Sequence, residues 1–187
     1  MKRNIAVFCG SSTPRNSKIV DAARELGYRI AEAGDVLVYG GSNLGLMGVV
    51  SAAALDAGGE VIGVIPRLFS EDIIQSQAVT ELVRVCSMGE RKERIMEMCD
   101  AFVALPGGIG TIDEISEVVA MNQLQIRDGR RVLDGTYRNK LMILLNLDGY
   151  YDPFFEQIRH AKEEGLMRSD AGLVDAATVD EVLCHIC

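Results

Sequence analysis

The feature that most constrains the fold of this chain is a glycine-rich turn between a predicted buried strand and a predicted helix. The apolar run 101–105 has the composition of a strand buried in a parallel sheet, and Gly107, Gly108 and Gly110 follow it. Beyond the turn, apolar residues recur at helical spacing, at positions 112, 115, 118 and 119. A bare turn that faces the N-terminus of a helix attracts anions, most often phosphate. The alternative is a tight turn that binds nothing.

The rest of the chain alternates between strand and helix patterns. Strands are expected at 5–9, 36–39, 60–65, 82–85, 101–105 and 141–145. Helices are expected at 17–33, from the glycine-rich loop 40–48 through 57, at 153–164, from about 88, from about 112 and from about 178. This order predicts an α/β fold, a Rossmann-like open parallel sheet with helices on both faces, in which ligands bind beyond the carboxyl ends of the strands. Residues 1–187 are expected to form one domain.

Composition narrows the range of partners. The 187 residues include 19 basic and 27 acidic side chains, and the formal net charge of −8 disfavours nucleic acid as a partner. No apolar run approaches the roughly 20 residues of a membrane span, and the start of the chain does not resemble a signal peptide, so a cytoplasmic protein without a membrane partner is expected. Five cysteines and two histidines favour neither a disulfide framework nor a metal site.

The central turn matches neither of two common nucleotide signatures. No Gly-Lys-Ser/Thr follows it, and Asp113 stands where a dinucleotide-binding motif needs glycine. The main-chain amides and the Thr111 hydroxyl therefore form the predicted phosphate site, with no ATP or NAD implied. A second glycine-rich loop, residues 40–48, follows a neighbouring strand and strengthens this prediction.

Two interpretations of Glu114 stay open at this stage. The spacing of Thr111 and Glu114 is that of a capping box, in which the carboxylate only returns a hydrogen bond to the helix start. Alternatively, Glu114 performs chemistry, and the nearby carboxylates Asp113 and Glu117 help to raise its pKa.

Arg91 is predicted to point inward. A capping pattern from Ser87 to Glu90 starts a helix at about Met88, and Arg91 shares the face of the apolar residues 95 and 98. A cation on a buried face needs an anion, which is either a carboxylate of the protein or a ligand. Lys92 and Arg94 are expected to face solvent or a partner.

Taken together, segments 40–48 and 106–114 and the pair Arg91-Lys92 resemble the Lonely Guy family of phosphoribohydrolases. Members of that family release the free base from cytokinin riboside 5′-monophosphates, and often from AMP. The resemblance implies that Arg91 and Glu114 are the catalytic pair, that the turn from Gly108 to Thr111 binds the 5′-phosphate, that a homodimer completes the pocket, and that no metal or organic cofactor is used. The residues expected to contact the purine nucleoside monophosphate are Ser11, Gly41, Met88, Lys92, Gly107, Gly108, Ile109, Gly110, Thr111 and Glu117.

The chain departs from the family pattern at Gly89, at Ser42-Asn43 and at Met121-Asn122, which are changes that could alter base preference. Segment 127–140 is about ten residues longer than the family's usual link, and its two Asp-Gly pairs suggest a hairpin or flap over the pocket or at the dimer interface. The rival function is a non-catalytic carrier of a nucleotide or of the molybdenum cofactor on the same scaffold. Retention of both Arg91 and Glu114 favours the enzyme.

Overall fold

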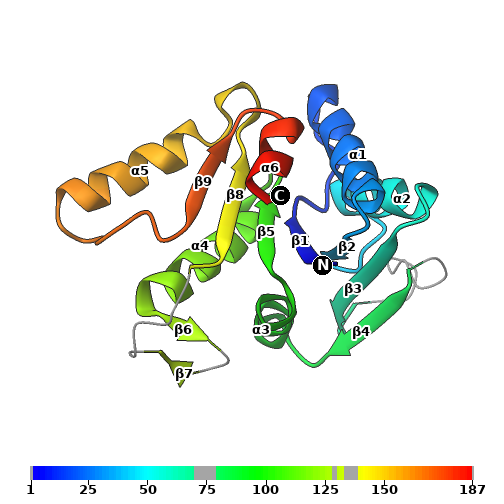
Figure 1. The fold of residues 1–187 in the computed structure, drawn as a ribbon, viewed down its shortest axis with the longest axis horizontal. Helices are drawn as coiled ribbons and strands as arrows, with labels where there is room; N and C mark the ends of the chain where they lie inside the picture. Colours follow the sequence, from blue (N-terminus) through cyan, green and yellow to red (C-terminus); the bar gives the residue numbers. More distant parts are fainter. Residues whose placement is uncertain (1, 70–78, 128–129, 133–138, 187) are drawn as a thin grey trace.

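A computed structural model describes residues 2–69, 79–127, 130–132 and 139–186 (Figure 1). Its described strands form a seven-stranded sheet in the order β4-β3-β2-β1-β5-β8-β9, in which every neighbouring pair is parallel. The strands are β1 (Asn4–Phe8), β2 (Val36–Tyr39), β3 (Glu60–Pro66), β4 (Glu81–Val85), β5 (Ala101–Ala104), β8 (Leu141–Leu145) and β9 (Leu173–Ala176). The predicted Rossmann-like α/β fold is confirmed.

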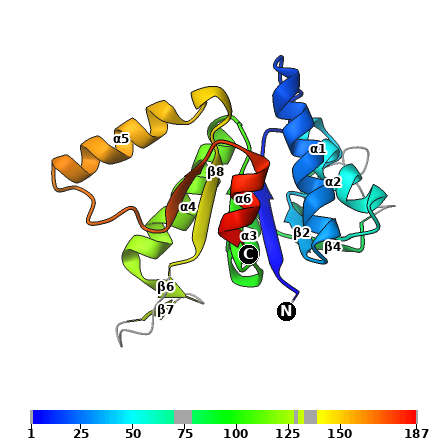
Figure 2. The same cartoon turned by 45° about the horizontal axis from the view of Figure 1, so that its top comes forward.

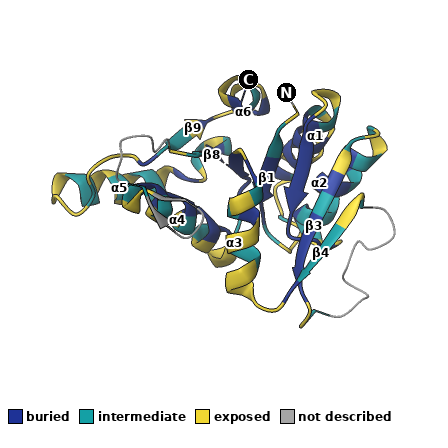
Figure 3. Cartoon of the chain, turned by 60° about the horizontal axis from the view of Figure 1, so that its bottom comes forward, coloured by how far each residue is buried: buried dark blue, intermediate teal, exposed yellow. Residues whose placement is uncertain are grey.

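Helices cover both faces of the sheet (Figures 1 and 2). One face carries α1 (Ser17–Glu32), α2 (Gly45–Asp56) and α6 (Val179–Ile186), and the other carries α3 (Met88–Met98), α4 (Ile109–Leu124) and α5 (Asp152–Glu163). The strands supply alternate residues to the two cores: in β1, Ile5 and Val7 pack against the first set of helices, and Ala6 and Phe8 against the second. Buried residues are concentrated in the central strands (Figure 3), as expected for a sheet that packs against helices on both faces.

The strand order reverses between β1 and β5, and this reversal positions the site. Phe8 is in register with Ala104, and the Leu105 N–H donates to the Phe8 carbonyl at 3.0 Å. The loops that follow these two strands therefore leave the sheet side by side. A β-carbon built on Gly10 would lie 4.0 Å from the Gly107 Cα. Ligands of open α/β sheets bind in the crevice at such a reversal.

Most predicted elements lie within two residues of their expected bounds. The predicted helix start at Thr178 is confirmed, and half of the capping box is formed: the Thr178 hydroxyl accepts from the Glu181 N–H, whereas the Glu181 carboxylate accepts from the Ala177 N–H and not from that of Thr178. Strand β3 ends at Pro66, as expected, and Pro66 itself is in register with Val85. Strand β9 was not predicted as a separate element. None of the helices in the described ranges has the length and apolar character needed to cross a bilayer.

The predicted hairpin is present in the part of segment 127–140 that the structure describes. Strands β6 (Ile126–Arg127) and β7 (Arg130–Arg131) pair antiparallel. Residues 128–129 and 133–138, which hold both Asp-Gly pairs, lie outside the described residues. The hairpin follows the C-terminus of α4, a 16-residue helix about 24 Å long that begins at the glycine turn. The two strands therefore start at the end of α4 away from the pocket of their own chain.

Candidate active site

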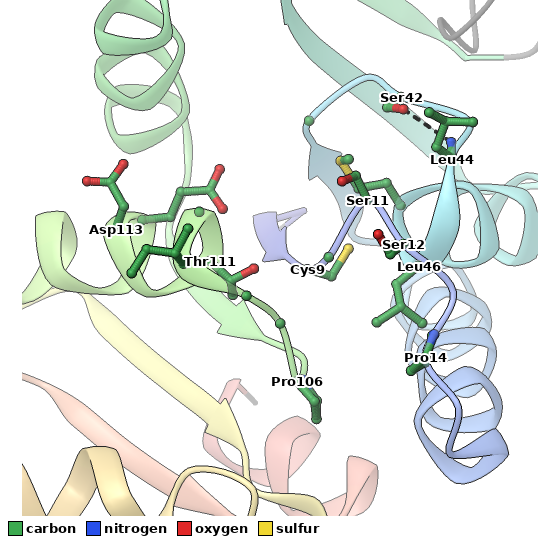
Figure 4. Close-up of a pocket in the computed structure, with 18 of the residues that line it drawn as sticks. Cys9, Ser11, Ser12, Pro14, Ser42, Leu44, Leu46, Pro106, Thr111 and Asp113 are labelled. Carbon is green, nitrogen blue, oxygen red and sulfur yellow. Dashed lines mark hydrogen bonds between the residues drawn. The ribbon is translucent and has the colours of Figure 1, made fainter.

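A cavity of about 670 Å³ opens at the carboxyl ends of the strands, between the first turns of α2 and α4 (Figure 4). Its walls come from the loops after β1, β2 and β5, with further residues from α3 and from the segment after β8. The central turn predicted from the sequence lies in this wall, because Gly107, Gly108, Ile109, Gly110 and Thr111 all line the cavity.

The start of α4 supplies the predicted anion site. Gly108 is the N-cap residue, and no side chain of the described residues caps the helix, so its first N–H groups are available to a ligand. A β-carbon on Gly108 or Gly110 would meet none of the described residues within 4 Å, and the main chain is therefore open to close approach. The helix begins two residues before Thr111, so the capping-box interpretation of Thr111 and Glu114 is wrong. Both residues lie inside the helix, and both are buried.

Arg91 and Glu114 form a buried ion pair across the cavity wall. The Arg91 Nη2 lies 3.3 Å from the Glu114 Oε1, and the two side chains are only 12% and 8% exposed. Arg91 points inward, as predicted, and its anion in this structure is the carboxylate. The Arg91 Nε is buried and has no hydrogen-bond partner among the described residues. A β-carbon on Gly40 would overlap the Arg91 guanidinium, so the second glycine-rich loop provides the space that this arginine occupies.

The environment raises the pKa of Glu114 from 4.5 to about 6. Burial is the largest cause, Arg91 opposes it, the neighbouring Asp113 adds to the increase and Lys92 opposes it weakly. Because the folded-state pKa lies above the ordinary value, the folded state is relatively more stable with Glu114 protonated, and this contribution is lost as the pH rises through about 6. Near neutral pH the carboxylate is mostly ionised but remains a competent proton acceptor.

Lys92 occupies a different place from the one predicted. Its side chain is only 18% exposed and lies between α3 and α4, where the Nζ donates to Asp113 at 3.1 Å and to Glu117 at 3.0 Å. Burial acts to lower the pKa of Lys92, but these two hydrogen bonds raise it overall. Glu117 is thus held by Lys92 and does not contribute to the raised pKa of Glu114. Arg94 faces solvent, as expected, with its side chain 55% exposed.

The structure brings most of the predicted site residues together. Besides the turn, the predicted residues that line the cavity are Ser11, Met88, Arg91 and Glu114, whereas Gly41, Lys92 and Glu117 do not line it. The backbone at Gly41 favours glycine, because its φ is +76°. A β-carbon there would also lie only 2.9 Å from the Ile65 Cβ.

Several residues of the cavity wall were not predicted as site residues, and Cys9 and Tyr150 are two of them. Cys9 follows β1 directly, and burial raises the pKa of its thiol, which keeps it protonated. Tyr150 comes from the segment after β8 and donates from its hydroxyl to the Gly107 carbonyl at 2.7 Å. The sequence offers one signal for Tyr150, which is its position after a buried strand and an Asp-Gly pair. Loops that follow the carboxyl ends of parallel strands lie near the ligand in open α/β sheets.

These features combine an anion site with a buried carboxylate and a fixed cation. An anion at the start of α4 would lie one helical turn from Glu114, which can accept a proton, while the Arg91 guanidinium can offset negative charge. Within the described ranges, no cluster of three or more His, Cys, Asp or Glu side chains could hold a metal ion. This arrangement suits proton abstraction from water beside a phosphorylated ligand.

Comparison with known proteins identifies relatives along nearly the whole chain. A family model described as "Possible lysine decarboxylase" matches residues 47–183. The chain is 42% identical over 186 residues to the cytokinin riboside 5′-monophosphate phosphoribohydrolase LOG of Oryza sativa subsp. japonica, covering 98% of this chain and 72% of that protein. It is 40% identical over 183 residues to LOG3 of Arabidopsis thaliana, which carries the same enzyme name, covering 97% and 80%.

A solved structure shares the fold at lower identity. The molybdenum cofactor carrier protein of Chlamydomonas reinhardtii superimposes with a TM-score of 0.71 at 23% identity, covering 100% of this chain and 96% of the other. At this identity the match supports the fold and does not extend to function.

We predict that replacing Arg91 with methionine raises the pKa of Glu114 above about 6, by roughly one to three units. The reason is that the carboxylate would keep its burial but lose the nearby cation. Titration of the Glu114 carboxyl carbon by NMR measures the shift directly. The matched change Lys92→Met should move this pKa less, because Lys92 has the smallest of the four effects. A pKa that falls or stays constant in Arg91→Met would contradict this account of the site.

Proposed function

The chain belongs to the family of the LOG cytokinin riboside 5′-monophosphate phosphoribohydrolases, and from that membership we propose that it hydrolyses the N-glycosidic bond of a purine nucleoside 5′-monophosphate, releasing the free base and ribose 5-phosphate. Both AMP and the isoprenylated cytokinin nucleotides are proposed substrates. The single observation that carries the proposal is the buried Arg91–Glu114 pair in the cavity wall, one helical turn beyond an uncapped, glycine-rich helix start.

The proposed chemistry needs a carboxylate near the sugar. Departure of the base leaves an oxocarbenium-like centre at the anomeric carbon, which the Glu114 carboxylate can stabilise while it takes a proton from the attacking water. The water oxygen forms the new bond to carbon, and the electron pair of the broken bond leaves with the base. The base needs one proton and the water releases one, so the reaction balances without a redox partner. Arg91 holds the substrate and offsets the developing negative charge.

The phosphate provides binding energy away from the reacting bond. We propose that it binds the amides of the turn from Gly108 to Thr111, together with the Thr111 hydroxyl. Gly107, Ile109, Gly110, Ser11 and Met88 would complete the binding surface, since all of them line the cavity. A nucleoside without the phosphate should then be a poor substrate, because this anchoring contribution is absent.

Other activities fit the residues less well. A carrier of a nucleotide or of the molybdenum cofactor requires the phosphate turn but gives no reason to bury a carboxylate beside an arginine at high desolvation cost. A lysine decarboxylase would normally bind pyridoxal phosphate through a lysine, and no lysine is among the described residues that line the cavity.

We also propose that the protein acts as a homodimer. On α4, Ile109 is 84% exposed and Leu124 is 51% exposed, and Leu166 beyond α5 is 81% exposed. Helix α5 has no fully buried residue: Phe154 and Phe155 pack against the core of this chain but, like Ile158, remain partly exposed. In both views α5 extends away from the sheet on the side of α4 (Figures 1 and 2). A second copy would cover this apolar surface.

A cytoplasmic location is proposed with the same function. The cysteines Cys9, Cys86, Cys99 and Cys184 are free thiols, which suits a reducing compartment.

The first test is hydrolysis of AMP and of isopentenyladenosine monophosphate, followed by chromatography of the free base. Glu114→Gln should lower kcat by about 10²- to 10⁴-fold, because the variant cannot accept the proton of water. Glu93→Gln, which changes an exposed glutamate of α3 outside the cavity, should stay within twofold of the parent. If the parent binds both nucleotides and cleaves neither, the carrier becomes the better proposal.

The rate of hydrolysis should depend on the protonation state of Glu114. If Glu114 acts as the base, kcat/KM should fall tenfold per pH unit below a midpoint near 6, because protonation removes the acceptor, and should level off above it. The 5′-phosphate also titrates near pH 6, so the control substrate is the nucleoside, which lacks that group. A midpoint near 4.5 for the nucleoside would argue against a buried catalytic carboxylate.

The proposed dimer can be tested by the mass of the protein in solution. Sedimentation of the parent should give about twice the mass of one chain, and the double variant Leu124→Asp, Leu166→Asp should sediment as a monomer, since it places two charges in the proposed interface. Tyr28→Asp, a comparably exposed position on α1 at the opposite face of the sheet, should leave the mass unchanged. A parent that sediments as a monomer at micromolar concentration would refute the dimer.

A further inference from the structure

The segment between β8 and α5 reaches across the carboxyl edge of the sheet to the central glycine turn. It contains a 3₁₀ turn (η2, Leu147–Gly149) followed by Tyr150 and Tyr151. The Tyr151 hydroxyl donates to the Leu105 carbonyl and the Tyr150 hydroxyl donates to the Gly107 carbonyl, both at 2.7 Å. Two consecutive side chains thus hold the two carbonyls on either side of Pro106.

Asn146, at the end of β8, fixes the backbone of this segment by hydrogen bonds. This side chain is buried at the end of β8; its carbonyl accepts from the Tyr151 N–H at 2.6 Å, and its amide donates to Asp152 at 2.8 Å. Gly149 adopts φ of +75°, and a β-carbon there would lie within 3 Å of the Asp152 carboxylate. The backbone that carries the tyrosines is therefore constrained before either hydroxyl reaches the turn.

The two tyrosines differ in their burial. Tyr151 is 2% exposed and meets Tyr150 edge to face, with ring centroids 5.1 Å apart. Tyr150 is 47% exposed and lines the cavity. Tyr151 belongs to the core, whereas Tyr150 is a polar group of the cavity wall that the proposed reaction does not use.

We propose that Tyr150 is a positioning residue, which fixes the Gly107–Gly108 peptide of the phosphate-binding turn in one orientation. This inference rests on the proposed function. A peptide between two glycines has few steric barriers to rotation, so a single orientation needs an external contact. The peptide is planar and trans, and holding the Gly107 carbonyl also sets the direction of the Gly108 N–H, the first amide of the turn.

The same hydrogen bond has an electrostatic effect. Gly107 lines the cavity, and the partial negative charge of its carbonyl oxygen would disfavour an anion nearby. The Tyr150 hydroxyl places a donor on that oxygen and so offsets this charge. Both effects act on the affinity for the phosphate group and neither requires contact between Tyr150 and the base.

The test compares Tyr150→Phe with the parent, because this change removes the hydroxyl and keeps the ring. Calorimetry should show an about 2- to 13-fold weaker Kd for ribose 5-phosphate, the range that corresponds to one net hydrogen bond. The KM for AMP should rise by a similar factor, whereas kcat/KM for adenosine, which has no phosphate, should stay within twofold. The melting temperature should fall by no more than about 2–4 °C, since the ring remains and only one hydrogen bond is lost.

The matched control is Tyr28→Phe, which removes a hydroxyl from a tyrosine of similar exposure, 49%, on α1 outside the cavity. It should leave all four values unchanged. An unchanged Kd for ribose 5-phosphate in Tyr150→Phe would overturn the proposal, as would an equal loss with adenosine. Failure of the parent to cleave any nucleotide would refute the hydrolase alone, because the binding of ribose 5-phosphate still tests Tyr150.

Discussion

The ion pair between Arg91 and Glu114 is the interaction on which the rest of the site depends. Removing two charges from water costs more than their attraction usually returns, so such a pair is poor evidence for stability. Here its surroundings are arranged to make burial possible: Gly40 leaves space for the guanidinium, α3 presents Arg91 in its first turn, and α4 presents Glu114 from the opposite side. Burial raises the pKa of Glu114 to about 6 even though Arg91 opposes the increase. This pKa suits proton transfer near neutral pH, and stability of the fold does not require it.

Glycine has two separate functions around the cavity, and the distinction matters for substitutions. At Gly40 and Gly107 a β-carbon would overlap Arg91 or Thr111, so glycine is needed there for packing of side chains behind the turn. At Gly108 and Gly110 no atom of the part of the chain that the structure describes lies within 4 Å of a β-carbon, so packing against that part does not account for glycine at these two positions. An approaching ligand gives the missing reason, because only a bare main chain lets its oxygens reach the amides.

The sequence predicted the fold and the main parts of the site because both depend on local patterns. Apolar runs identified the strands, and the spacing of Arg91 with residues 95 and 98 placed the arginine on the inner face of α3. The capping-box interpretation of Glu114 failed because a glycine can serve as N-cap without a side chain, which left two possible helix starts. The contacts of Lys92 and Tyr150 could not be predicted, since they join segments 21 to 43 residues apart whose approach depends on the packed sheet.

Helix α4 sets the distance between the proposed phosphate site and the Glu114 carboxylate. Thr111 and Glu114 are three residues apart on its inward face, which separates them by about 4.5 Å along the axis, and both are buried. A phosphate bound at the first turn would therefore lie at a nearly constant distance from the carboxylate, because Ile115, Val118 and Val119 pack α4 against the sheet and the rise of the helix is fixed. The sugar of a nucleoside 5′-monophosphate must span that distance for its anomeric carbon to reach Glu114. Under the proposed function, anchoring the phosphate would thus orient the reacting bond as well as strengthen binding, and both effects would act through the same helix.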